Sequence, residues 1–369
     1  MIRLVPVRAA RAWHCTVVGT LLAAAPLLAS SHEDPREWLQ KMSQALATRN
    51  YDGTFFHLSD GRVEAMRITH SYQNGRATER LQSLEGAGRE YIRKDGRLTC
   101  YLPDKHRILV ETSPGGGPFL SALPRFGDGA DQYYRIDALP DARVLGKPVH
   151  VIVVSPKDHY RFGYRLWLDA KTAMPLKTQL CDSRGRVLEQ ILFASLKMPK
   201  SIPARDLEPN LSTVGMQRVV QNPAGRATPG AADFRAAELP PGFHLTVAGA
   251  QTIGTAKRPA EHLVYSDGLA TVSVFVEPGR ARGAEAIATA ATGAGPQASA
   301  PMHGLARLGA GFAFSTVVQG HQVTAVGEVP AETVEFIAQA VKAFGDDSMP
   351  QPRLPPAMSS ASHLSNPRH

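Results

Sequence analysis

The sequence predicts a β-rich protein of the α+β class, built from two domains. Short segments with alternating polar and apolar residues recur along most of the 369 residues, and Gly-containing turns separate them. Helical periodicity is confined to two stretches, one near the start and one near residue 340. The length fits two ordinary domains, and 43% hydrophobic with 20% charged residues is typical of globular proteins.

Residues 1–29 have the pattern of a secretory signal peptide. Three arginines (Arg3, Arg8 and Arg11) precede the apolar stretch "VVGTLLAAAPLLA", and small residues follow it. The stretch is short for a membrane span and contains Pro26. We expect cleavage near Ala29 and a soluble, exported protein; an uncleaved anchor is the alternative.

The exported chain opens with a predicted amphipathic helix, "DPREWLQKMSQALATR". Asp34 suits the N-cap and Pro35 the first helical position. Apolar residues then recur at helical spacing: Trp38, Leu39, Met42, Ala45 and Leu46. We expect this face to pack on the core of the first domain.

Residues 30–200 are predicted to form that first domain. Strand-like segments follow one another, and Gly-Arg after a polar residue marks the turns at Gly61, Gly75, Gly96 and Gly185. Consecutive hairpins build a large antiparallel sheet, and such a sheet curls. The Gly- and Pro-rich segment 112–131 is either a binding loop or a plain surface loop.

A second, smaller domain is predicted over residues 233–345. Residues 201–232 show little periodicity and are predicted to be a linker. Two hairpins and a closing helix, "PAETVEFIAQAVKAF", make up the second domain, around the low-complexity segment 281–300. Residues 346–369 are predicted to be a disordered tail.

Charge and motifs restrict the function. The formal charge is +8, of which the three signal-peptide arginines supply three. In an exported protein this charge argues against nucleic acid, and it suits an anionic lipid, a membrane surface, an acidic peptide or simple solubility. No catalytic elbow, metal-binding helix or phosphate loop occurs, so we expect no enzyme, no metal and no cofactor.

Two cysteines remain after cleavage, Cys100 and Cys181. An even number in an oxidising compartment permits a disulfide, and two buried free thiols are the alternative. The sequence leaves this choice open.

The stretch "HLVYSDGLATVSVFVE" brings His262, Ser266 and Asp267 together, which are residue types of hydrolytic sites. Strict alternation continues on both sides of Ser-Asp-Gly, with Val272, Val274 and Val276 on one face. A catalytic triad requires its three groups to converge in space. We therefore interpret the stretch as a hairpin turn.

Several segments together resemble the RseB/MucB family, periplasmic negative regulators of an envelope-stress sigma factor. They are "YDGTFFHLSDGRVEAMRITH", "LQSLEGAGREYIRKDGRLTCYLPD", "YRFGYRLWLDAKTAMPLKTQLCDSRGRVLEQILFASL" and "HLVYSDGLATVSVFVE". The resemblance covers residues 35–200 and 234–345. It implies an N-terminal unclosed antiparallel β-barrel with packed helices, similar to lipoprotein carriers, and a smaller C-terminal α+β domain.

The resemblance also implies partners. The family binds the periplasmic domain of a membrane-anchored anti-sigma factor and shields it from the first protease. Lipopolysaccharide or its lipid part releases it. A periplasmic lipid or lipoprotein carrier is the alternative function, and whether the chain forms a homodimer stays open.

Candidate site residues follow from this. For the anti-sigma factor they are Tyr265, Ser266, Asp267, Gly268, Leu269 and Phe275, which otherwise only shape the hairpin. For a lipid cavity they are Met66, Ile68, Leu81, Leu84, Tyr101, Leu166 and Trp167, which otherwise fill an ordinary core. For lipid phosphates they are Arg62, Arg67, Arg76, Arg80 and Arg97, which otherwise lie on a solvated strand face.

Overall fold

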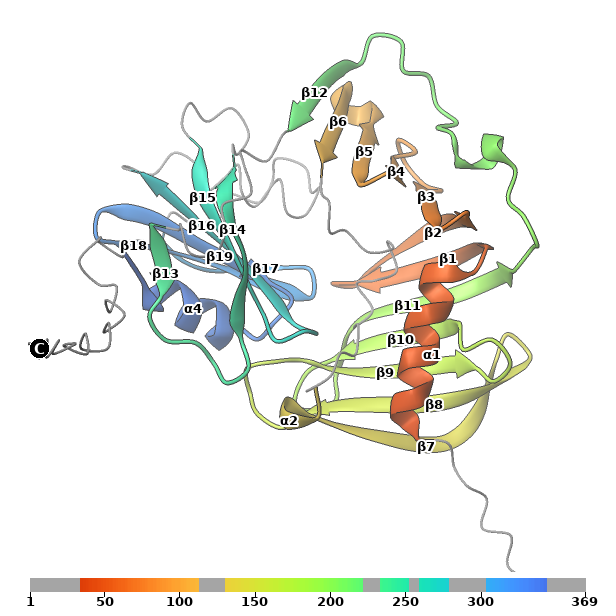
Figure 1. Cartoon of the computed structure of the whole chain (residues 1–369), viewed down its shortest axis with the longest axis horizontal. Helices are drawn as coiled ribbons and strands as arrows, with labels where there is room; N and C mark the ends of the chain where they lie inside the picture. Colours follow the sequence, from red (N-terminus) through yellow and green to blue (C-terminus); the bar gives the residue numbers. More distant parts are fainter. Residues whose placement is uncertain (1–33, 113–129, 222–232, 252–258, 279–302, 344–369) are drawn as a thin grey trace, which may run out of the picture. The chain divides into compact units, whose positions relative to one another are not determined.

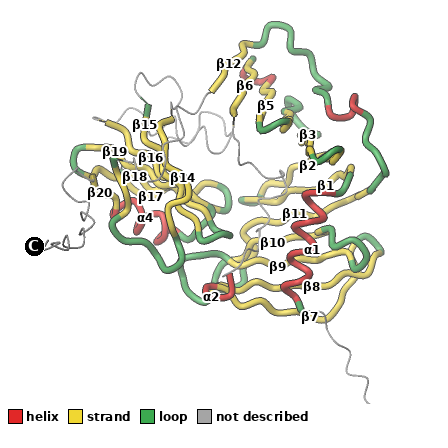
Figure 2. The backbone as a smooth tube through the Cα atoms, in the orientation of Figure 1, coloured by secondary structure: helices red, strands yellow, loops and turns green. Residues whose placement is uncertain are grey.

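The computed structural model describes residues 34–112, 130–221, 233–251, 259–278 and 303–343. The predicted signal peptide, most of the segment 112–131, the segment 281–300 and the tail from residue 346 lie outside these residues. The described part contains a 12-stranded sheet, a six-stranded sheet and a two-stranded sheet (Figures 1 and 2). None of the helices among the described residues is long and apolar enough to cross a bilayer.

The first helix, α1, begins as the sequence predicts. It spans Pro35–Thr48, and the Asp34 side chain accepts a hydrogen bond from the Arg36 N–H at 2.9 Å. Its apolar face is buried through Leu39, Met42, Ala45 and Leu46. The helix lies across one face of the large sheet (Figure 1).

The large sheet has the strand order β12-β6-β5-β4-β3-β2-β1-β11-β10-β9-β8-β7. Among the described residues β12 and β7 do not pair with each other, so the sheet is unclosed, as expected. The strands are β1 (Tyr51–Ser59), β2 (Arg62–Gln73), β3 (Arg76–Ser83), β4 (Glu90–Lys94), β5 (Arg97–Leu102), β6 (Arg107–Thr112), β7 (Tyr134–Val144), β8 (Lys147–Pro156), β9 (Gly163–Asp169), β10 (Pro175–Cys181), β11 (Val187–Lys197) and β12 (Gln217–Gln221). Short helical turns accompany them: η1 (Pro103–Lys105), α2 (Ala130–Tyr133) and η3 (Ala204–Leu207).

The predicted hairpin turns are confirmed. Between β2 and β3, Asn74 has φ 52° and Gly75 has φ 78°. Two successive positive φ angles are those of a two-residue turn whose twist matches the flanking strands. Asp60-Gly61 and Asp95-Gly96 repeat the same geometry.

One face of the large sheet and α1 enclose the core of the first domain. The core residues on β1, β2, β8 and β9 include Tyr51, Phe55, Ile68, Ile152 and Leu166. Side chains alternate across the sheet, so their sequence neighbours lie on the opposite face.

The segment predicted as a linker is attached to the first domain. Its strand β12, at residues 217–221, pairs with β6 in parallel. Upstream, the buried pair of Arg80 and Glu90 forms two hydrogen bonds of 2.9 Å. The Glu90 carboxylate also accepts the Asn210 N–H at 3.2 Å, and Arg80 donates to the Asp206 carbonyl. A buried ion pair therefore fastens this segment to β3 and β4.

The second domain contains the six-stranded sheet, in the order β14-β15-β16-β19-β18-β17. Its strands are β14 (His244–Gln251), β15 (Ala260–Ser266), β16 (Thr271–Pro278), β17 (Gly304–Leu308), β18 (Gly311–Val318) and β19 (His321–Gly327). The predicted alternation is confirmed, because Val272, Val274 and Val276 lie in one core with Val334 and Ile337 of the helix α4 (Ala331–Ala340).

The closing helix is shorter than predicted. α4 spans Ala331–Ala340, and Val341–Ala343 form the strand β20, which pairs with β13 (Phe234–Ala236). Val341 is buried in the core of the second domain, but it belongs to the strand β20 and not to the helix. Pairing with β13 satisfies its backbone groups, so the helix ends one turn early.

Both described cysteines, Cys100 on β5 and Cys181 on β10, are free thiols. Cys181 is buried and Cys100 half-buried. Burial raises the pKa of the Cys100 thiol to about 11, so the thiolate is scarce at neutral pH.

Candidate functional site

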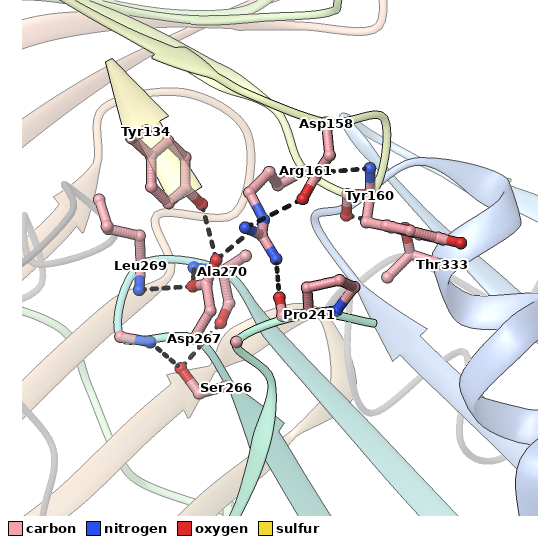
Figure 3. A network of polar contacts seen from close by, with 12 residues as sticks. Tyr134, Asp158, Tyr160, Arg161, Pro241, Ser266, Asp267, Leu269, Ala270 and Thr333 are labelled. Carbon is pink, nitrogen blue, oxygen red and sulfur yellow. Dashed lines mark hydrogen bonds and ion pairs between the residues drawn. The ribbon is translucent and has the colours of Figure 1, made fainter. Parts of the chain in front are cut away.

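The Ser-Asp-Gly turn connects β15 to β16 and satisfies its own backbone. Asp267 Oδ1 accepts hydrogen bonds from the N–H groups of Leu269 (2.8 Å) and Ala270 (2.6 Å). Ser266 Oγ donates to the Ala270 carbonyl at 2.8 Å and accepts from the Gly268 N–H at 3.0 Å. Gly268 has φ 97°, which a residue with a side chain rarely adopts. These bonds hold the Asp267 carboxylate in a fixed direction (Figure 3).

The second carboxylate oxygen of Asp267 meets the first domain. Asp267 Oδ2 accepts a hydrogen bond of 2.9 Å from the Tyr134 hydroxyl, at the start of β7. The same oxygen lies 3.1 Å from Nε of Arg161, in the loop between β8 and β9. Neither the Arg161 nor the Asp267 side chain is exposed. A turn of the second domain thus forms a buried ion pair with a loop of the first (Figure 3).

Arg161 is surrounded by further partners from both domains. Its Nη2 donates to the Pro241 carbonyl, and its Nη1 lies 3.2 Å from Asp158 Oδ2. The Nε and Nη1 groups approach the carboxylates without aligned hydrogen bonds, so Coulomb attraction dominates these contacts. Such attraction must offset the desolvation of a buried guanidinium, which costs several kcal/mol.

Aromatic rings complete the environment of this guanidinium. Its central carbon lies 4.8 Å from the ring centre of Tyr133, 5.5 Å from that of Tyr134 and 5.2 Å from that of Phe243. Burial, and then the Asp267 charge, raise the pKa of Tyr134, so its hydroxyl stays a neutral donor. The site therefore contains one buried cation, two carboxylates and a fixed donor.

Further apolar and backbone contacts extend this contact between the two domains, which we call the joint. Leu269 packs against the first-domain core beneath α1. Phe162 and Leu180 form a cluster with Ala310 of the β17–β18 turn. Along α4, Thr333 Oγ1 donates to the Tyr160 carbonyl at 2.8 Å.

A small pocket lies beside the joint. Tyr164, Thr178, Ile191 and Glu189 of the first domain line it together with Glu328 of the second. The space inside it is about 30 Å³, enough for one water molecule. Glu189 also pairs with His57 at 2.8 Å, and this hydrogen bond raises the pKa of His57.

The arrangement can fix how the two domains meet; its groups form no catalytic constellation. His262 does not approach Ser266 or Asp267 through any described contact, and its ring stacks on Phe275 with centres 4.5 Å apart. No group of three potential metal ligands occurs among the described residues. The turn interpretation of the sequence is confirmed.

The predicted partner residues lie mainly inside the protein. Tyr265 is 1% exposed, and its hydroxyl accepts the Ala236 N–H at 2.8 Å. Asp267 and Leu269 contact the first domain. These three side chains pack within the described part of the chain, and their contact with the anti-sigma factor stays a prediction. Anti-sigma-factor contact at Ser266, Gly268 and Phe275 stays a prediction.

The seven predicted lipid-cavity residues do not share one surface. Met66, Ile68 and Leu166 belong to the core beneath α1, with Leu81 packed against it. Tyr101 and Trp167 lie on the opposite face of the sheet, away from the core beneath α1. Leu84 follows the end of β3 and is 46% exposed. A single cavity lined by all seven is therefore wrong, because neighbours along a strand point to opposite faces.

The predicted arginines also divide. Arg62, Arg76 and Arg97 are exposed, whereas Arg67 pairs with Asp52 and Arg80 with Glu90. Sequence reasoning missed Arg161. It stands in the short loop "KDHYRF", and no local pattern connects it to Asp267, 106 residues later in the chain.

The joint combines two domains that family models match separately. Residues 34–211 match the MucB/RseB N-terminal domain, and residues 228–342 match the MucB/RseB C-terminal domain. This chain belongs to the MucB/RseB family. Among curated members, it is 30% identical to the "Sigma factor AlgU regulatory protein MucB" of Pseudomonas aeruginosa over 328 residues, 88% of this chain and 95% of that one. It is 25% identical to the "Sigma-E factor regulatory protein RseB" of Escherichia coli K12, over 89% of this chain and 96% of that one.

Solved structures of MucB agree with the fold. The Pseudomonas aeruginosa MucA/MucB complex is similar at a TM-score of 0.62 and 27% identity, covering 85% of this chain and all of that one. A crystal structure of MucB alone gives a TM-score of 0.58 at 27% identity, with 84% and 98% coverage. The similarity to MucB thus extends over both domains.

Proposed function

We propose that this MucB/RseB protein acts in the periplasm, where it binds the periplasmic domain of a membrane-anchored anti-sigma factor. The observation that carries the proposal is its similarity across both domains to a MucB solved in complex with MucA(peri), at a TM-score of 0.61. A relative that matched only one domain would not support binding by the whole chain.

Binding shields the anti-sigma factor from the protease that begins its degradation, and lipopolysaccharide or its lipid part releases the shield. The two-domain construction supports this proposal, because a shield must hold a stable shape until a signal arrives. The buried Arg161–Asp267 pair gives the joint such stability, since separating it would leave two unpaired charges.

The proposed lipid signal acts at the unclosed sheet. Its helix-covered face has an apolar core that an acyl chain would have to enter, displacing contacts such as those between α1 and Leu166. Leu269 packs against the same core, so a change there would reach the joint. The proposal is a ligand-dependent change in how the domains meet.

One reconstitution tests the proposal. The exported chain is incubated with the periplasmic domain of the anti-sigma factor from the same organism and with its first protease, and cleavage is followed over time. We expect slower cleavage, restored by lipopolysaccharide. Unslowed cleavage overturns the shielding function, and slowed cleavage that lipopolysaccharide leaves unchanged overturns only lipid release.

A lipid or lipoprotein carrier is the second candidate function. The unclosed sheet with its apolar, helix-covered face favours it. A carrier would bind acyl lipid without slowing the cleavage of an anti-sigma factor, so the same reconstitution separates the two functions.

A further inference from the structure

The face of the large sheet opposite α1 carries a row of side chains that crosses six neighbouring strands. The strand register aligns Phe56, Leu192, Lys177, Trp167, Val151 and Leu139, in this order, on β1, β11, β10, β9, β8 and β7. With neighbouring strands about 4.8 Å apart, the row is about 24 Å long. We call this row, with Val63 and Arg165 of the next row, the outer row.

The two ends of the outer row are exposed apolar surface, whereas Val151 in its middle is 4% exposed and packs with Trp167. Phe56 is 40% exposed and Leu139 43% exposed, at its two ends. Val63, paired with Leu58 two residues from Phe56, is 54% exposed. Single exposed apolar residues are common, but several aligned on one face indicate an interaction surface.

The charges of the outer row are positive. Lys177 Nζ lies 4.4 Å from the ring centre of Trp167, so the aromatic ring and the ammonium group form one unit. Arg165 lies two residues from Trp167 on the same face. Within the described residues neither Lys177 nor Arg165 forms an ion pair with a carboxylate. Asp137, which is aligned with Arg165 through Val153, pairs with Arg135 at 2.8 Å.

This combination has a known physical use. A tryptophan with a neighbouring lysine, flanked by apolar side chains, suits the boundary between headgroups and acyl chains of a bilayer. The ammonium group reaches the headgroup phosphates while the ring and the aliphatic groups stay among the upper carbons. We propose that the outer row is a docking surface for the anionic lipid bilayer.

Charge favours a bilayer over a second copy of the chain. In a two-fold interface, the same patch faces itself, so Lys177 and Arg165 would approach their own counterparts. An anionic bilayer presents the opposite charge and needs no matching contour. The proposal goes beyond the proposed function, whose lipid acts on the helix-covered face.

Vesicle flotation of the exported chain tests the proposal. The probe is vesicles of equal parts phosphatidylglycerol and phosphatidylethanolamine at low salt, compared with pure phosphatidylcholine. We expect binding to the anionic vesicles only, weakened by salt. Phe56→Asp combined with Val63→Asp should lower the partition coefficient at least about ten-fold, and Lys177→Gln about five-fold.

Leu305→Asp is the matched control. Leu305 on β17 is 42% exposed, so the substitution adds one charge at a similarly exposed apolar site outside the outer row. It should leave vesicle binding unchanged. Thermal unfolding verifies that every variant is folded, and Lys177→Gln keeps the test valid should the double aspartate variant not fold.

The fluorescence of Trp167 measures whether this side chain enters the bilayer. Vesicles with brominated acyl chains should quench the fluorescence of the exported chain, and Trp167→Phe should remove most of this quenching. Equal binding of Leu305→Asp and the outer-row variants overturns the proposal, as does wild-type protein that ignores anionic vesicles. A concentration-dependent dimer that the double aspartate variant dissolves, without vesicle binding, assigns the face to a second copy instead. The cleavage assay is independent of all these outcomes.

Discussion

Arg161 of the first domain and Asp267 of the second form a 3.1 Å ion pair in which neither side chain is exposed. The two residues come from a loop and a turn, which are usually the solvated parts of a fold. Here they form the polar centre of the domain joint.

Removal of Arg161 should destabilise the protein strongly. Arg161→Ala leaves Asp267 buried without its cation, and such loss typically costs about 3–5 kcal/mol. Urea denaturation measures the free energy of unfolding. Arg186→Ala is the control, because Arg186 is largely exposed beside Asp182 and its removal should cost less than about 1 kcal/mol. Equal losses in the two variants would contradict a structural role for the Arg161 pair.

Tyr134→Phe should cost about 1.5–3 kcal/mol, because the hydroxyl donates a hydrogen bond to a charged, buried carboxylate. Combined with Asp267→Asn, its effect should shrink, since the acceptor is then uncharged. A double-mutant cycle of unfolding free energies measures this coupling. Strict additivity would show that the two groups do not interact.

Stability should fall in mild acid because of His262. Burial lowers the pKa of this ring to about 4, and its Nε2 has no hydrogen-bond partner among the described residues. The unfolded chain binds a proton near pH 6.5, so the folded state loses up to about 3 kcal/mol between pH 6.5 and 4.

His262→Phe should flatten this part of the pH profile of the unfolding free energy. His244→Phe, at an exposed position, removes a histidine without removing a buried one and should leave the profile unchanged. Parallel profiles for His262→Phe and wild type would disprove the assignment.

Glu90→Ala should release the connecting segment. It removes the partner of the buried Arg80 and the acceptor of the Asn210 N–H, so we expect a loss of about 3–5 kcal/mol. Hydrogen exchange at residues 206–221 should accelerate more than elsewhere. Asp104→Ala breaks a half-exposed pair with Arg89 and serves as the control. Unchanged hydrogen-exchange protection at β12 would show that the Arg80–Glu90 pair does not anchor this segment.

Cys100 should react slowly with alkylating reagents. Its pKa of about 11 lies two units above the ordinary value of 9.0, so the thiolate is about 100-fold scarcer at pH 8 or below. Iodoacetamide labelling followed by mass spectrometry measures the rate. A disulfide between Cys100 and Cys181 in the isolated protein would contradict the finding that both cysteines are free thiols.

Sequence reasoning succeeded where local chemistry decides the structure. Asn74-Gly75 specifies its turn by itself, and the alternation from Val272 to Val276 specifies which residues face α4. Both signals act within a few residues.

Sequence reasoning failed where residues distant in the chain determine the structure. Leu166 and Trp167 are adjacent and both apolar, and only the packing of α1 determines which of them is in the core. Arg161 acquires its role from Asp267, which the folded chain brings to it. The end of α4 at Ala340 depends on β13, about 100 residues upstream.

The parallel pairing of β12 with β6 shortens the tether between the domains. From the end of β11 at Lys197 to Phe234, an extended chain could reach about 130 Å, whereas from Gln221 it reaches only about 45 Å. A shorter tether raises the effective concentration of one domain near the other. When the Arg161–Asp267 contact opens, the domains remain close together, so the opening is an intramolecular event that reverses without a search through solution.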